Sequence, residues 1–217
     1  MQITIIGTGK MGSILASHLQ SKASLILCNR NMEKGQKLAE KLGASYVINP
    51  KEAVEGSDII ILAVKPKDFE EVASKFSLQK GQILISVLSG ISLDVLQKKF
   101  PSAEVFRMMP NTALSVGKGI IGFSGKESFK ESLFSLFANL GLLLWIAETQ
   151  MEAFAALAAS SPAFVFLFFE AMLEGGIYLG FSLEESRKIT LSVFEGCVAL
   201  LEQAEPGPEK LAITSPG

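Results

Sequence analysis

The sequence predicts an α/β fold in two parts, a doubly wound parallel sheet over residues 1–148 and an all-helical domain over residues 149–217. Short apolar runs alternate with helical periodicity up to about residue 146, as expected where crossover helices connect parallel strands. From residue 149 onward only helical periodicity remains, in two segments at about 149–179 and 183–203.

The first dozen residues predict a strand, a glycine-rich turn and the start of a helix. Residues 2–6 form a β-branched apolar run, typical of a buried strand, and apolar residues recur at helical spacing from residue 11. Between them stands a G-x-G-x-x-G motif, Gly7-Thr8-Gly9-Lys10-Met11-Gly12. Its glycines permit the tight turn, the approach of a pyrophosphate and close helix–strand packing, in that order. The context predicts the dinucleotide-binding loop of a Rossmann-type domain.

The end of the second strand indicates which dinucleotide binds. Residues 25–28 are apolar, and Asn29-Arg30 follows them. NAD binders place an acidic residue here for the ribose 2′-hydroxyl, whereas a 2′-phosphate favours an arginine. The absence of an acid and the presence of Arg30 predict NADP(H), the alternative being a solvated loop arginine.

A continuous apolar run at residues 58–64 predicts a central strand buried on both faces. It ends at Ala63-Val64-Lys65-Pro66, and loops beyond the carboxyl ends of such strands form the ligand crevice. Lys65 is therefore a candidate cofactor or substrate contact, with a solvated surface lysine as the alternative. Further strands are expected at 46–48, 82–88, 105–109, 119–123 and 142–146, helices at 32–42, 67–76 and 126–140, and a loop after Pro206.

Two apolar helices in the C-terminal part cannot bury themselves, so we expect a homo-oligomer, at least a dimer through these helices. Residues 153–169 carry no charge, but Ser160, Ser161 and Pro162 interrupt the run. A bilayer span needs about 20 apolar residues. A helix at a domain or subunit interface is the preferred interpretation, and no membrane partner is expected.

Composition excludes several functions. The formal net charge is −2 without a basic block, which argues against nucleic acid as a partner. Cys28 and Cys197 are far apart and there is one histidine, so neither a disulfide framework nor a metal site is expected. A reducing compartment and the absence of a signal-peptide pattern lead us to expect a cytoplasmic protein.

Residues for acid–base catalysis are scarce. His18 lies on the apolar stripe of the first helix and is expected to be packed there, and the carboxylates are interpreted mainly as solvated surface charge. Reduction of a ketone usually requires a proton donor, whereas a protonated imine accepts hydride and becomes a neutral amine. Such an enzyme needs mainly alignment of donor and acceptor. The catalytic residues are left unassigned.

Several motifs in one order resemble the pyrroline-5-carboxylate reductase family over nearly the whole chain. Beside the glycine loop and Ala63-Val64-Lys65-Pro66, the matching segments are residues 86–90 (SVLSG), 107–112 (RMMPNT), 160–164 (SSPAF) and 214–217 (TSPG). The resemblance implies NADPH-dependent reduction of 1-pyrroline-5-carboxylate to L-proline and dimerisation through interlocking C-terminal helices.

The resemblance also implies site residues. Val64, Lys65 and Pro66 would lie along the cofactor, and Pro110, Asn111 and Thr112 at its nicotinamide end. The substrate site would include Thr112, Ser160, Ser215 and Gly217, the last two holding the substrate carboxylate.

Two departures from the family pattern leave alternatives open. Where the family usually reads T-A-L-S-G, this chain has AALAA at residues 155–159, including Ala155, Ala158 and Ala159, and so lacks two hydroxyls. The sequence stops at Gly217, before a second glycine, paired threonines and a final helix, so half of the carboxylate cradle is absent. Either the sequence is incomplete or activity is impaired, and a catalytically impaired NADPH-binding homologue is one alternative. A β-hydroxyacid-type NADP-linked reductase is the other alternative. Such enzymes use a lysine on the long helix after the domain junction as acid/base, and residues 149–187 contain no lysine.

Overall fold

The computed structural model describes residues 1–214 and divides into two compact units, Met1–Ser160 and a second unit that begins at Ser161. Residues 148–160 belong to the first unit, where Met151 and Ala155 pack against Met109. The domain boundary that the sequence predicts, between residues 148 and 149, stays a prediction. The two units are described separately below.

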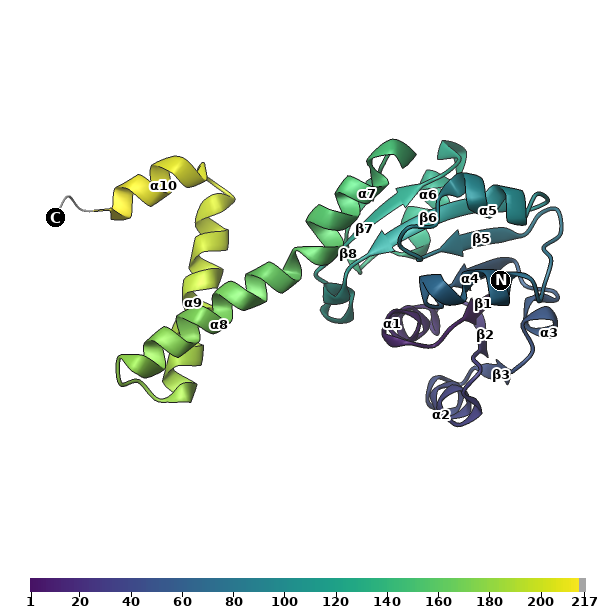
Figure 1. Cartoon of the computed structure of the whole chain (residues 1–217), viewed down its shortest axis with the longest axis horizontal. Coiled ribbons are helices and arrows are strands. Elements are labelled where there is room, and N and C mark those ends of the chain that lie inside the picture. The colour runs from purple at the N-terminus through teal and green to yellow at the C-terminus, as the bar shows by residue number, and fades with distance from the viewer. Residues whose placement is uncertain (215–217) are drawn as a thin grey trace. The chain divides into compact units, whose positions relative to one another are not determined.

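The first unit is built on one eight-stranded sheet with the order β3-β2-β1-β4-β5-β6-β7-β8 (Figure 1). Neighbouring strands are parallel except for β6 and β7, which are antiparallel. The chain moves outward from β1 to β3 on one side and from β4 on the other, so the switch point lies between β1 and β4. The strands are β1 (Gln2–Ile6), β2 (Ser24–Cys28), β3 (Ser45–Val47), β4 (Ile59–Leu62), β5 (Ile83–Ser86), β6 (Glu104–Pro110), β7 (Gly119–Ser124) and β8 (Gly141–Trp145).

Short helices connect the strands of this unit. They are α1 (Lys10–Leu19), α2 (Met32–Leu42), α3 (Pro50–Val54), α4 (Phe69–Ala73), α5 (Leu93–Lys99), α6 (Lys130–Leu136) and α7 (Met151–Phe154). A 3₁₀ turn at Pro66–Asp68 precedes α4, and a π-helical segment, Ala155–Ser160, follows α7. The predicted α/β class is confirmed.

Two apolar layers cover the faces of the sheet. In β4, Ile59 and Ile61 pack into one layer, whereas Ile60 and Leu62 pack into the other. Successive side chains of a strand point to opposite faces, so a strand with no polar position must be covered on both. This explains why the apolar run at residues 58–64 could be assigned to the centre of the sheet.

Three local predictions were wrong. The expected helix at 126–140 is shorter, a 3₁₀ turn at Glu127–Phe129 followed by α6, and Asn139 adopts a left-handed φ of 72° after it. The strand expected at 105–109 is one residue longer at each end, since β6 runs from Glu104 to Pro110. Helix α10 (Pro206–Ile213) replaces the expected loop, because prolines in the first turn of a helix occupy positions whose N–H groups need no intrahelical partner.

The second unit consists of α8 (Pro162–Tyr178), α9 (Leu183–Leu201) and α10. Gly176 lets α8 approach Ser186 closely, since a Cβ there would lie 2.7 Å from the Ser186 Oγ. Ser186 and Thr190 of α9 are buried, whereas within the described chain no residue of α8 is. This unit therefore lacks an apolar core of its own.

One described helical stretch, Glu148–Tyr178, is long and apolar enough to cross a membrane by length and composition alone, and 6% of its most apolar window is buried. A single stretch of this kind is weak evidence for a membrane span, and the π-helical segment with Ser160, Ser161 and Pro162 interrupts it.

Candidate cofactor-binding site

The glycine loop joins β1 to α1 and leaves open space above its middle. Gly7 has a φ of 96°, and a Cβ there would lie 2.6 Å from the Ala63 carbonyl oxygen. A Cβ at Gly12 would overlap the Gly7 carbonyl oxygen, whereas one at Gly9 would meet no atom within 4 Å. Gly7 and Gly12 are therefore required by packing of the protein itself. At Gly9 the missing side chain instead leaves the backbone accessible to a ligand.

The same loop offers unsatisfied donors to a ligand. Gly9 is the N-cap of α1 and provides no side-chain cap, so the first N–H groups of the helix point outward unpaired by a cap. The buried Thr8 Oγ1 has no hydrogen-bond partner within residues 1–214. An anion placed here would accept from the helix N-terminus and be stabilised by the helix dipole. The loop thus fits a pyrophosphate.

A cavity of about 230 Å³ opens beside the loop, at the carboxyl ends of β1, β2 and β4. Of the predicted cofactor residues, eight line it: Gly7, Thr8, Gly9, Asn29, Arg30, Ala63, Val64 and Lys65. Lys10, Met11, Gly12 and Pro66 adjoin these residues in sequence but do not line the cavity. The Tyr46 hydroxyl donates to the Asn29 carbonyl at 2.7 Å and so fixes the loop after β2. The assignment of these residues to the cofactor stays a prediction.

The predicted site residues did not include one wall of this cavity, which α4, the turn before it and the residues just after it supply. Asp68, Glu71 and Lys75 line the cavity together with Arg30. The Lys75 ammonium pairs with Glu71 at 2.6 Å, and this contact, with a smaller contribution from Arg30, lowers the pKa of Glu71. The signal was present, because Glu71 and Lys75 stand four residues apart, about one helical turn, shortly after the end of β4 at Leu62.

Cys28 lies at the floor of the same cavity. Burial raises the pKa of its thiol to about 11, partly opposed by the positive charge of Lys75. The thiol is therefore protonated at neutral pH and is a poor nucleophile or metal ligand. Among residues 1–214, no group of three His, Cys, Asp or Glu side chains is placed to hold a metal ion.

A second predicted group lies at the end of β6, where Pro110 is buried and Thr112 is exposed. Asn111 is buried, and its side chain is occupied by protein partners. Its Nδ2 donates to the Ala158 carbonyl at 3.1 Å, and its Oδ1 accepts from the Ala113 and Ile120 N–H groups at 3.2 and 3.3 Å. Asn111 thus ties the loop after β6 to the π-helical segment.

The π-helical segment ends at Ser160, which is exposed. Ala155 and Ala158, at positions where the family usually has hydroxyl side chains, are buried, and Ala155 packs against Met109. A π segment shifts the helical hydrogen bonds and often marks a functional site. Thr112 and Ser160 remain predicted substrate residues, whereas Ser215 and Gly217 lie outside the residues that the structure describes.

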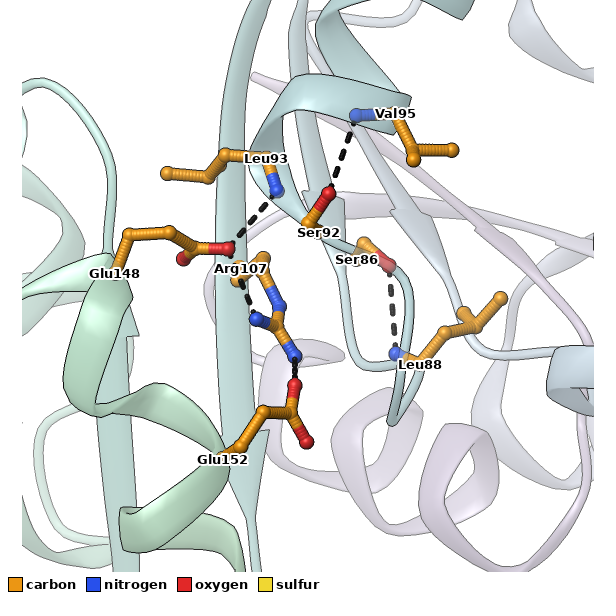
Figure 2. A network of polar contacts seen from close by, with 8 residues as sticks. All are labelled: Ser86, Leu88, Ser92, Leu93, Val95, Arg107, Glu148 and Glu152. Atoms are coloured by element: carbon orange, nitrogen blue, oxygen red, sulfur yellow. Dashed lines mark hydrogen bonds and ion pairs between the residues drawn. The ribbon is translucent and has the colours of Figure 1, made fainter.

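The interpretation of the carboxylates as mainly surface charge was wrong for Glu148, whereas the Glu152 side chain is 62% exposed although it pairs with the same arginine. Arg107 of β6 is almost fully buried, and its Nη1 and Nη2 donate to Glu148 at 2.9 Å and to Glu152 at 2.7 Å (Figure 2). The same Glu148 Oε1 accepts from the Leu93 N–H at 3.0 Å, at the start of α5. A buried arginine needs such partners, so an arginine within an apolar strand was the signal in the sequence.

His18 is partly buried on α1 and lies outside the cofactor cavity. Its Nε2 is 3.3 Å from the Leu136 carbonyl, and burial, assisted by the positive charge of Lys22, lowers its pKa. Packing against the end of α6 agrees with the expectation that His18 is not an acid catalyst.

Comparison with known proteins shows to which family the chain belongs. A family model described as NADP oxidoreductase, coenzyme F420-dependent, matches residues 2–90, and one described as pyrroline-5-carboxylate reductase dimerisation matches residues 148–217. A pyrroline-5-carboxylate reductase of Aquifex aeolicus is 34% identical over all of this chain and 85% of the relative. The chain belongs to the pyrroline-5-carboxylate reductase family. The predicted resemblance is thereby confirmed.

Solved structures agree with the family. A 1-pyrroline-5-carboxylate reductase from Streptococcus pyogenes superposes with a TM-score of 0.93 at 28% identity, covering 100% of this chain and 86% of that one. A pyrroline carboxylate reductase from Plasmodium falciparum, with NADP bound, has a TM-score of 0.87 at 24% identity and covers 100% of this chain and 85% of that one. The latter likeness supports the fold.

Proposed function

We propose that this protein is an NADPH-dependent pyrroline-5-carboxylate reductase that forms L-proline from 1-pyrroline-5-carboxylate. Family membership over the whole chain carries the proposal. It is supported by a glycine loop with open space above Gly9, an orphaned Thr8 hydroxyl and an arginine-bearing cavity at the switch point of the sheet. A dinucleotide binds at this position in doubly wound sheets.

Different residues of the cavity bind different parts of the cofactor. The N-terminus of α1 and Thr8 hold the pyrophosphate, and Asn29 and Arg30 at the end of β2 hold the adenosine ribose and its 2′-phosphate. Lys65 and the loop after β6 extend the site toward the nicotinamide end. When bound, the reduced nicotinamide supplies a hydride to the imine carbon of the substrate.

The protein's own contribution to the reaction is alignment. Asn111 holds the loop after β6 against the π-helical segment, and the Arg107 network holds the start of that helical stretch at Glu148. Thr112 and Ser160 then face substrate from these two elements. A protonated imine becomes an amine without a proton donor at the reacting carbon, which agrees with the position of His18 outside the cavity.

The second unit acts in dimerisation. Helix α8 exposes large side chains such as Phe164, which is 70% exposed, and Phe166, and its residues are not buried within the described chain. Two copies of this chain can cover these faces mutually. The active form is a cytoplasmic homodimer or larger ring, and its mass should be measured by size-exclusion chromatography with light scattering.

One assay tests the function. NADPH oxidation is followed at several concentrations of 1-pyrroline-5-carboxylate, with L-proline quantified as product and NADH as the comparison cofactor. Turnover with NADPH supports the proposal, and a clear preference for NADH would refute the role of Arg30. Binding of NADPH without turnover would instead establish the impaired homologue, which Ala155 and Ala158 favour.

The departures from the family pattern can be tested in the same assay. The variant A155T/A158S restores both hydroxyls at buried positions, of which residue 155 packs against Met109. If these hydroxyls serve the reaction, the variant should raise kcat/KM for 1-pyrroline-5-carboxylate while the Kd for NADPH stays constant. An unchanged kcat/KM would show that the alanines do not limit activity.

A further inference from the structure

The adenosine end of the cofactor cavity has charged side chains on two opposing walls. Arg30 stands after β2 on one wall, and Asp68, Glu71 and Lys75 belong to the helical segment after β4 on the other. The cavity therefore carries three cationic side chains, Lys65 included, against two carboxylates. A dinucleotide site that had only to bind a 2′-phosphate would gain nothing from a carboxylate placed there.

The carboxylate of Glu71 lies within the electrostatic range of both cations. Its Oε1 is 2.6 Å from the Lys75 Nζ, and Arg30 also lowers its pKa, so Glu71 is ionised at neutral pH. Lys75 lines the same cavity as Cys28, two residues before Arg30, and its positive charge partly opposes the effect of burial on the pKa of the Cys28 thiol. Both side chains of the pair thus line the same cavity as Arg30.

We propose that Glu71 and Lys75 form a second, opposing determinant of cofactor choice, in an inference that rests on the proposed function. With NAD(H), Glu71 accepts a hydrogen bond from the adenosine ribose 2′-hydroxyl, the role that an acid after β2 usually has. With NADP(H), Lys75 contacts the 2′-phosphate together with Arg30, and its pairing with Glu71 is exchanged for pairing with phosphate. The balance between the two residues sets the ratio of affinities for the two cofactors.

The variants isolate each side chain. Glu71→Gln removes the charge that repels a 2′-phosphate and should lower the Kd for 2′,5′-ADP about three- to tenfold, the range of a single partly exposed charge interaction. The same variant should raise the Kd for 5′-AMP. Lys75→Met should raise the Kd for 2′,5′-ADP by a similar factor and leave the Kd for 5′-AMP nearly constant.

A neighbouring ion pair provides the matched control. Glu70 and Lys99 pair at 3.9 Å, and neither lines the cavity. Glu70→Gln and Lys99→Met change the net charge in the same way and should leave both Kd values unchanged. Glu71, Lys75 and Glu70 are exposed, so thermal melts should show that the corresponding variants remain folded.

Calorimetric titration of the full chain with 2′,5′-ADP and 5′-AMP decides the proposal without any need for turnover. Opposite changes in the ratio of the two Kd values for Glu71→Gln and Lys75→Met, absent from the controls, support it. Equal ratios in all variants, or changes as large in the controls, overturn it. If the parent protein binds 2′,5′-ADP but fails to reduce 1-pyrroline-5-carboxylate, the proposed function fails while the variants still decide this inference; if it binds neither nucleotide, both fail.

Discussion

Replacing Glu148 by alanine should destabilise the first unit far more than replacing Glu152, although both carboxylates pair with the same arginine. The Arg107 side chain is 2% exposed, whereas those of Glu148 and Glu152 are 30% and 62% exposed. Solvent screens the Glu152 pair, and exposed pairs contribute about 1 kcal/mol or less. Glu148 is the partner that offsets the burial of the guanidinium (Figure 2).

The magnitude follows from the bonds that Glu148 makes. Its Oε1 accepts from Arg107 at 2.9 Å and from the Leu93 N–H at 3.0 Å. A hydrogen bond between charged groups contributes about 1.5–3 kcal/mol and a further bond to the backbone about 1 kcal/mol. Glu148→Ala should therefore cost about 2.5–4 kcal/mol of unfolding free energy, or roughly 5–16 °C in Tm for a unit of this size.

Thermal and urea unfolding of the parent, E148A, E152A and R107M/E148A would measure these differences. The last variant removes the uncompensated charge together with its partner, so it should recover part of the stability lost in E148A. Equal losses in E148A and E152A, or no recovery in R107M/E148A, would refute the assignment of Glu148 as the principal counterion.

Three further outcomes are expected. Burial lowers the pKa of His18, so the unfolded chain binds a proton at higher pH than the native protein does. Stability should therefore fall as pH drops below the ordinary pKa of about 6.5. In melts at several pH values, His18→Gln should flatten that decline. Ellman's reagent should leave Cys28 unmodified in native C197S protein and modify it after unfolding, because its thiol has a pKa of about 11; rapid modification in the native state would contradict this. Gly9→Ala should keep the parental Tm and weaken NADPH binding, whereas Gly12→Ala should lower the Tm, since only the second added methyl overlaps backbone; a stable Gly12→Ala variant would show the loop to be adaptable.

The central sheet could be predicted because its determinants are local. A strand such as β4 has four consecutive buried aliphatic residues, and no arrangement other than burial on both faces satisfies them. The glycine loop could be predicted for the same reason, since each position that requires a residue without a side chain is a glycine of the motif. The antiparallel pairing of β7 with β6 could not be read in this way, because strand direction depends on the path of the connecting chain.

Long-range polar contacts were the principal gap in the prediction of the site. Arg107 and Glu148 are 41 residues apart, and neither segment alone indicates that the other faces it. Asn111 is a predicted cofactor residue, and the hydrogen bond from its amide to the Ala158 carbonyl, 47 residues further along the chain, could not be predicted from either segment alone. Glu71 and Lys75 were overlooked because an (i, i+4) pair on a short helix ordinarily indicates only a solvated surface.

The accessibility of α8 has a kinetic consequence. A 17-residue helix of which residues 1–214 bury no residue gains little free energy from packing against them. If a second copy supplies the missing contacts, completion of this part of the fold is a bimolecular reaction, and its rate and extent depend on protein concentration. Dilution would then unfold the C-terminal helices before it affected the sheet, and nascent chains would be vulnerable to proteolysis at α8 until they met a partner.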